Sequence, residues 1–101
     1  MEIRLLRREP NELRIEIEGE GHTFCNMLQK ALLEDEMVEM AGYDVPHPLM
    51  TKAIVYVRTK NKRKPETAIR NAAKTVLKRS KELRNALEKA FKEYDEAASR
   101  G

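Results

Sequence analysis

The sequence predicts a two-layer α+β domain with the element order β-β-α-β-β-α, in which a four-stranded sheet carries both helices on one face. Three observations support this fold class. Residues 13–18 alternate apolar and charged side chains, which is typical of a strand with one buried face. Residues 24–32 repeat apolar side chains at helical spacing, and residues 66–97 contain no proline or glycine, so a long final helix is expected.

The first two elements form a predicted hairpin. Ile3 and Leu5 occupy alternate positions in a short first strand, and residues 9–12 supply a turn with proline and asparagine. The second strand places apolar side chains at Leu13, Ile15 and Ile17 and charged side chains between them. The glycines at 19 and 21 end this strand, because glycine is unfavourable inside strands and favourable in turns.

The third element is an amphipathic helix that starts at His22 or Thr23. Thr23 is the expected N-cap, with Asn26 as a weak counterpart of the capping-box acid. One apolar stripe collects Phe24, Met27, Leu28, Ala31 and Leu32, and Leu33 widens it. The acidic residues 34–36 lie at the C-terminal end, where the helix dipole disfavours anions. The sequence offers no local reason for them.

Two further strands are expected after this helix. Residues 38–45 form the first, with Gly42 at a bulge or a close backbone approach. Pro46 and Pro48 flank His47 and favour extended backbone. Residues 53–57 form the second, and their uninterrupted apolar character predicts a central strand that is covered on both faces.

The final helix should extend beyond its own domain. It runs from Pro65 to about residue 97, and about 30 residues span about 45 Å. A domain of about 100 residues is only some 30–35 Å across. The apolar stripe nevertheless continues through Leu83, Leu87, Phe91 and Tyr94, so we expect a partner to cover it. The alternative is a helix that bends over its own domain and frays beyond Leu87.

Composition is consistent with one small domain, residues 1–101, that another chain completes. Charged residues make up 37% of the 101 residues, against 41% hydrophobic, so the core is modest beneath charged faces. The net charge of +3 is small and mixed along the chain, which does not favour a dedicated nucleic-acid binder. One cysteine, no signal peptide and no apolar span of about 20 residues indicate a cytoplasmic protein without a membrane segment.

Residues that could carry chemistry do not form a recognisable site. His22, Cys25 and His47 lack the paired short spacing of a zinc site, and no orienting group accompanies a Cys–His pair. We therefore expect no catalytic residue, no cofactor and no metal. The basic cluster at 60–64 lacks interleaved aromatic residues and is expected to be a solvated connector. The alternative function is a small stand-alone nucleic-acid-binding α+β protein that uses this cluster.

The sequence resembles the small alpha-like assembly subunits of DNA-directed RNA polymerases, and the archaeal subunits called L most of all. The likeness covers nearly the whole chain. The residues that carry it are His22, Thr23, Phe24, Asn26, Leu28, Leu32 and Leu33, followed by Val38, Ala41, Gly42, Tyr43, His47 and Pro48.

This resemblance implies a heterodimer with the larger alpha-like subunit, called D in archaea, on which the two large catalytic subunits assemble. It implies no direct sequence-specific contact with nucleic acid, and catalytic magnesium ligands that lie on another subunit. His22, Thr23 and Asn26 would fix the helix start. Cys25 departs from the small residue common in relatives, which favours a packing role. Residues facing the partner or the shared core would be Phe24, Met27, Leu28, Ala31, Leu32, Ile69, Ala73, Val76, Leu77 and Leu83.

Overall fold

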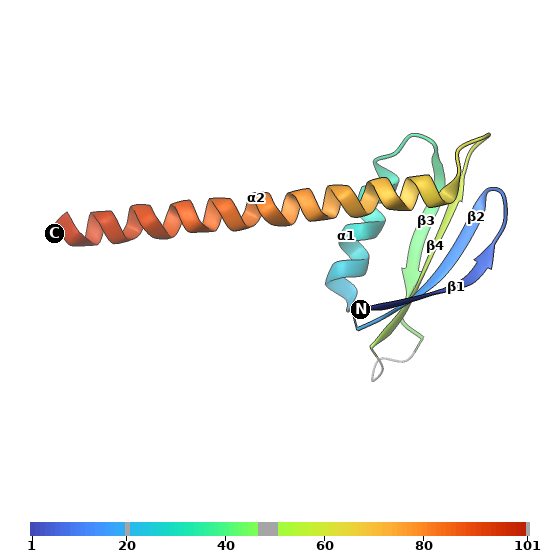
Figure 1. The fold of residues 1–101 in the computed structure, drawn as a ribbon, viewed down its shortest axis with the longest axis horizontal. Helices are drawn as coiled ribbons and strands as arrows, with labels where there is room; N and C mark the ends of the chain where they lie inside the picture. Colours follow the sequence, from blue (N-terminus) through green and yellow to red (C-terminus); the bar gives the residue numbers. More distant parts are fainter. Residues whose placement is uncertain (20, 47–50, 101) are drawn as a thin grey trace.

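The computed structural model describes residues 1–19, 21–46 and 51–100, and it confirms the predicted α+β class and element order. Figure 1 shows a sheet at one end of the molecule and a long helix that extends far beyond it. The elements are β1 (Glu2–Arg8), β2 (Glu12–Glu18), α1 (His22–Leu33), β3 (Val38–Asp44), β4 (Lys52–Thr59) and α2 (Pro65–Arg100).

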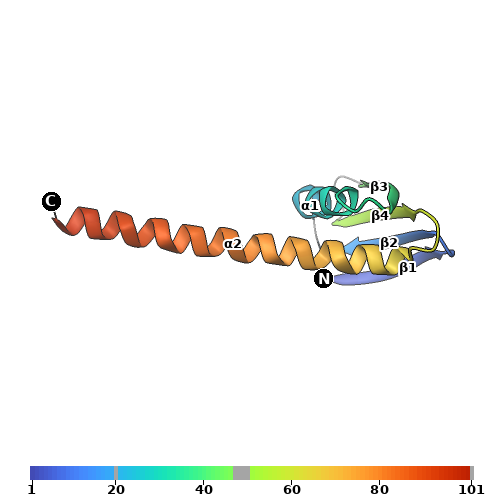
Figure 2. The ribbon, with the colours of Figure 1, turned by 90° about the horizontal axis from the view of Figure 1, so that it is seen from above.

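The four strands form one antiparallel sheet in the order β1-β2-β4-β3, so β1 and β3 are its edges. Both helices lie on the same face, where α1 contacts β3 and β4 while α2 contacts β4 and β2 (Figures 1 and 2). The prediction that β4 is central is confirmed. The prediction that it is covered on both faces is wrong: Ala53, Val55 and Val57 are buried, but Ile54 and Tyr56 are half-buried on the face without helices.

The core lies between the sheet and the two helices. The alternating residues of β2 point into it, as the sequence predicts, because every second side chain of a strand faces the same way. The buried hydrophobic residues are Leu13, Ile15, Ile17, Cys25, Leu28, Ala31, Leu32, Val38, Ala41, Ala53, Val55, Val57, Ala68, Ala72 and Val76. All of these buried residues precede residue 77, and residues 77–100 of α2 are exposed.

The β1–β2 hairpin forms as expected, with reciprocal backbone hydrogen bonds between Glu9 and Glu12 across its turn. Ile3 pairs with Ile17 and Leu5 with Ile15, so both face the helix side of the sheet. The register shifts between Leu5 and Arg7, which is a β-bulge. Every residue of β1 is exposed, because the two helices pack mainly on β2, β3 and β4.

Gly42 allows a close approach between neighbouring strands. A Cβ at this position would overlap the hydroxyl and ring of Tyr56, which lies opposite on β4. The close-approach prediction is therefore confirmed, whereas the bulge in β3 lies between Val38 and Met40 instead. His47 and Pro48, the predicted rigid bend, lie outside the described residues.

The molecule is elongated because of α2. This helix has 36 residues and is therefore about 54 Å long. The radius of gyration is 17.6 Å, compared with about 13 Å for a compact chain of this length. Pro65 occupies its first position, where the missing N–H costs nothing. The helix stays straight and does not fold back, so the bending alternative is wrong (Figures 1 and 2).

Candidate dimerisation surface

The last two-thirds of α2 form the most unusual surface of the chain. Its first turns bury Pro65, Ala68, Ala72 and Val76, whereas every residue from 77 to 100 is exposed. These 24 residues extend about 36 Å from the domain. Most of the stability of a helix in a protein comes from packing of its amphipathic face, and this segment packs on nothing within its own chain. This exposed helix therefore has the features of one side of an interface.

A salt bridge marks the point where α2 leaves the domain. Arg79 donates to both carboxylate oxygens of Glu34 at 2.8 Å, across 45 residues of sequence. This pairing supplies the reason for an anion at the end of α1 that the local sequence lacks. In the part of the chain that the structure describes, no hydrogen bond or ion pair joins α2 beyond Arg79 to another element. We call residues 80–100 the overhang.

The apolar stripe of the overhang continues the buried face of α2. At 100° per residue, the side chains of Leu83, Leu87 and Tyr94 point within about 20° of the direction of Val76, and Phe91 within about 60°. The stripe therefore lies on the same face of α2 as the buried residues, but no other element of the described chain covers it. Leu83 is 62% exposed, Leu87 44% and Phe91 58%. Contiguous exposed apolar side chains of this kind mark interaction sites.

The predicted interface residues of α1 mostly fill the chain's own core. Leu28, Ala31 and Leu32 are buried beneath α1, while Phe24 and Met27 are half-buried at its margin. Phe24 and Met27 therefore have surface left for a partner. The other three fill the chain's own core, and their contact with a partner stays a prediction.

The predicted residues of α2 separate in the same way. Val76 is buried and Ile69 half-buried, but Ala73, Leu77 and Leu83 are exposed. The predicted set stops at Leu83, whereas the structure extends the exposed stripe through Leu87, Phe91 and Tyr94. The helical spacing already contained this signal. The exposure of β1 had no sequence signal, since alternating Ile3 and Leu5 indicate burial in most strands.

The helix-start residues His22, Thr23 and Asn26 are all exposed at the beginning of α1. The N-cap prediction for Thr23 is wrong: α1 begins at His22, Gly21 is the N-cap, and no side chain caps the helix. Thr23 lies two residues after the N-cap position, inside the first turn of the helix. His22 instead contacts β3, with Nδ1 3.4 Å from the Tyr43 hydroxyl and the two rings edge to face at 5.8 Å.

Comparisons with known proteins identify the family. The family model described as the RNA polymerase Rpb3/Rpb11 dimerisation domain matches residues 12–97. The chain belongs to this family.

Similar proteins come from archaea. DNA-directed RNA polymerase subunit Rpo11 of Methanocella arvoryzae is 43% identical over 74 residues, which cover 73% of this chain and 80% of that one. Rpo11 of Thermococcus kodakarensis is 40% identical over 93 residues, 90% of this chain and 99% of that one. The crystal structure of RNA polymerase subunit L from Thermoplasma acidophilum matches with a TM-score of 0.77 at 29% identity, covering 93% and 92% of the two chains.

Two of the residues that could have carried chemistry in this Rpb3/Rpb11-type domain, His22 and Cys25, lie on α1 but differ in exposure. Cys25 is fully buried in the core, so its thiol is not accessible as a nucleophile, while His22 is exposed. Within residues 1–19, 21–46 and 51–100, no group of three metal-ligating side chains comes together. Over the same ranges, no helix is long and apolar enough to cross a membrane.

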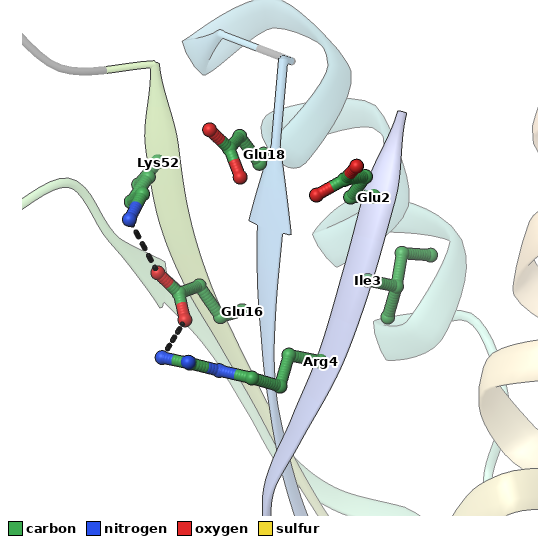
Figure 3. A pocket seen from close by; sticks show the side chains of 6 residues that line it. All are labelled: Glu2, Ile3, Arg4, Glu16, Glu18 and Lys52. Atoms are coloured by element: carbon green, nitrogen blue, oxygen red, sulfur yellow. Dashed lines mark hydrogen bonds and ion pairs between the residues drawn. The ribbon is translucent and has the colours of Figure 1, made fainter.

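The outer face of the sheet, opposite the helices, carries a network of paired charges. Figure 3 shows a shallow depression where Glu16 pairs with Arg4 at 2.7 Å and with Lys52 at 3.7 Å. Further along the face Glu12 accepts hydrogen bonds from Arg58, and this bond holds the pKa of the Glu12 carboxyl below its usual range. Carboxylates that are already paired with cations are poorly placed to act on a substrate.

The basic connector at 60–64 of this family member is an ordered loop. The Asn11 amide donates to the carbonyls of Thr59 and Asn61 at 3.1 and 2.8 Å. Asn61 has a positive φ of 54°, which asparagine tolerates well. Arg63 pairs with Asp35 at 3.5 Å, so one cation of the connector already has a partner within the chain.

Proposed function

We propose that this chain is a non-catalytic assembly subunit of a DNA-directed RNA polymerase. It pairs with the larger alpha-like subunit, D in archaea, and this heterodimer is the platform on which the two large catalytic subunits assemble. The whole chain, residues 1–101, acts as one dimerisation domain in the cytoplasm, where the polymerase meets its DNA. Membership in the Rpb3/Rpb11 dimerisation family and similarity to Rpo11 subunits support this proposal.

The observation that carries the proposal is the uncovered stripe of the overhang. Leu83, Leu87, Phe91 and Tyr94 form an apolar line beyond the domain, in register with the buried face of α2. A partner helix or sheet that covers this stripe removes apolar surface from water, which is the main favourable term in association. A catalytic role finds no comparable support, because the carboxylates of Glu12, Glu16 and Glu34 lie in surface ion pairs.

The test is co-purification from cells that express tagged chain together with its polymerase subunits. We expect the wild-type chain to recover the larger alpha-like subunit and, through it, the large subunits. Leu87→Glu places a charge in the stripe and should abolish this recovery. Asn85→Glu is the matched control, because residue 85 lies on the opposite side of the same helix turn and is also exposed to solvent.

Recovery of the polymerase subunits by Leu87→Glu at the wild-type level would contradict the proposed role of the overhang. Failure of the wild-type chain to recover any polymerase subunit would contradict the assembly function itself. Circular dichroism of both variants should match the wild type, since neither position contributes to the core.

A further inference from the structure

Positive charge is concentrated in one segment, which runs from the connector into α2. Residues 60–81 contain nine of the chain's 20 lysines and arginines but only one of its 17 acidic residues, Glu66. This segment therefore carries a charge of +8, and because the whole chain carries only +3, the remaining residues together carry −5. The small net charge of the chain conceals this asymmetry, which is typical of surfaces that contact polyanions.

The cations of α2 within this segment gather on one side of the helix. At 100° per residue, four of them point within about 60° of the direction opposite to the buried Val76: Arg70, Lys74, Lys78 and Lys81. All four are exposed. They face away from the core and from the apolar stripe of the overhang, so a partner that covers the stripe does not cover them.

The connector adds two lysines to this surface. Lys62 and Lys64 line a shallow hollow together with Thr67, in the first turn of α2. Thr67 points to the same side of the helix as Lys74, because seven residues make nearly two full turns. Lys60 is not part of this surface, since it lines a separate hollow beside the β1–β2 turn. We call the resulting set the basic ridge: Lys62, Lys64, Arg70, Lys74, Lys78 and Lys81.

The charge of the basic ridge is not balanced within the chain. Over residues 1–19, 21–46 and 51–100, no salt bridge involves any of its six cations. Arg70, Lys74 and Lys78 are spaced at i, i+4, where like charges repel each other and weaken a helix. Beyond residue 81 the same helix mixes its charges, as where Glu93 follows Lys89 by four residues. The ridge therefore keeps an unfavourable arrangement that an anionic ligand would relieve.

The composition of the ridge favours phosphates as that ligand. Five of its six cations are lysines, which are depleted at protein–protein interfaces, whereas arginine is enriched there. Residues 60–81 contain no aromatic side chain, so they offer no stacking platform for the bases of a single strand. α2 is straight (Figures 1 and 2), and from Arg70 to Lys81 it rises about 17 Å, a length over which a duplex presents about ten phosphates.

We propose that the basic ridge binds the phosphate backbone of a nucleic-acid duplex, independently of base sequence. Contacts to phosphates position a protein on a duplex but do not read its bases. The inference goes beyond the assembly function and does not depend on it, because the ridge and the stripe lie on different sides of α2. An assembled subunit could therefore use both surfaces at once.

The binding test measures fluorescence anisotropy of labelled duplexes of about 20 base pairs, one of DNA and one of RNA, titrated with the full chain. For four to six phosphate contacts, the logarithm of the association constant should fall with the logarithm of the salt concentration at a slope of about −4 to −5. The variant Lys74→Gln/Lys78→Gln/Lys81→Gln should raise the dissociation constant at least about 30-fold at about 50 mM salt. It should also make the slope shallower by about 3, since each lost phosphate contact removes about one.

The matched control is Lys30→Gln/Lys89→Gln/Lys92→Gln, which removes the same charge from exposed positions outside the ridge. It should bind within about threefold of the wild type. The melting temperature of both variants should not fall below that of the wild type, because every substituted residue is exposed and the ridge variant loses like-charge repulsion.

Binding to either duplex, with the expected loss in the ridge variant, would support the inference, and the duplex bound more tightly identifies the source of the phosphates. A wild-type chain that binds neither duplex would overturn it, as would a ridge variant that binds as tightly as the control. Tighter binding to a single strand of the same length would rule out a duplex as the ligand. Displacement of the duplex by polyglutamate at equal charge concentration would instead identify the ridge as a site for an acidic protein segment, and the inference would fail.

Discussion

Removing the apolar stripe of the overhang should weaken the heterodimer without weakening the fold. The perturbation is the triple variant Leu83→Ala/Leu87→Ala/Phe91→Ala. Complete burial of a leucine or phenylalanine side chain contributes about 1.5–3 kcal/mol relative to full exposure. These side chains are 62%, 44% and 58% exposed, so roughly half of that contribution, about 0.7–1.9 kcal/mol each, is available to a partner.

The magnitude follows from the sum of these three contributions. Because alanine retains the β-carbon, we expect a total loss of about 2–4 kcal/mol of binding free energy. Since each 1.4 kcal/mol is tenfold, the dissociation constant should rise about 30- to 700-fold. The free energy of unfolding of the isolated chain should change by less than about 0.5 kcal/mol, because none of the three side chains enters the core.

Two measurements check this reasoning. Calorimetric titration with the larger alpha-like subunit gives the dissociation constant, and urea unfolding of the isolated chain gives its stability. The matched control is Lys81→Ala/Asn85→Ala/Lys92→Ala, which alters three exposed residues on the opposite side of the overhang. The dissociation constant of the stripe variant should exceed that of this control by about 30-fold or more. A difference of less than about threefold would refute the assigned role of the stripe. It is also refuted if the isolated chain loses more than about 1 kcal/mol of stability.

Two further predictions concern the domain itself. Leu32→Ala should lower the free energy of unfolding in urea by about 2–5 kcal/mol, because this side chain is fully buried. The exposed neighbour is the control, and Leu33→Ala should lower it by less than about 0.5 kcal/mol. Equal losses in the two variants would contradict the assignment of Leu32 to the core. Arg58 holds the pKa of Glu12 below 4.5, so the ionised carboxylate contributes stability above that pH that is lost as the pH falls through the lowered value. Glu12→Gln should therefore be slightly less stable than the wild type at neutral pH, and the difference should shrink on acidification below about pH 4.5; a pH-independent difference would contradict this.

Local patterns predicted much of the fold correctly. The alternation at Leu13, Ile15 and Ile17 identified a strand with one buried face, because strand geometry directs every second side chain to the same side. The stripe from Leu83 to Tyr94 identified an uncovered helix face, because its length exceeds what one small domain can cover. Both inferences depend only on the repeat distance of a regular element.

Other features depended on residues that are distant in sequence. β4 has an apolar run, but whether both of its faces are covered depends on where α1 and α2 pack, and both pack on one face. Thr23 is a good capping residue, but α1 begins one residue earlier, at His22. Glu34 is unfavourable for the helix dipole of α1, and its partner Arg79 is 45 residues away.

The sequence by itself therefore determined the type and order of the elements, and it identified the final helix as too long for its domain. These properties follow from side-chain periodicity within single elements. Only the tertiary structure decided which apolar residues are buried and which remain open. It placed Leu28, Ala31 and Leu32 inside the chain's own core, and it left Ile3 and Leu5 uncovered on the edge strand. The reason is physical: burial depends on the position of one element relative to another, and no periodicity within a strand or helix contains that information.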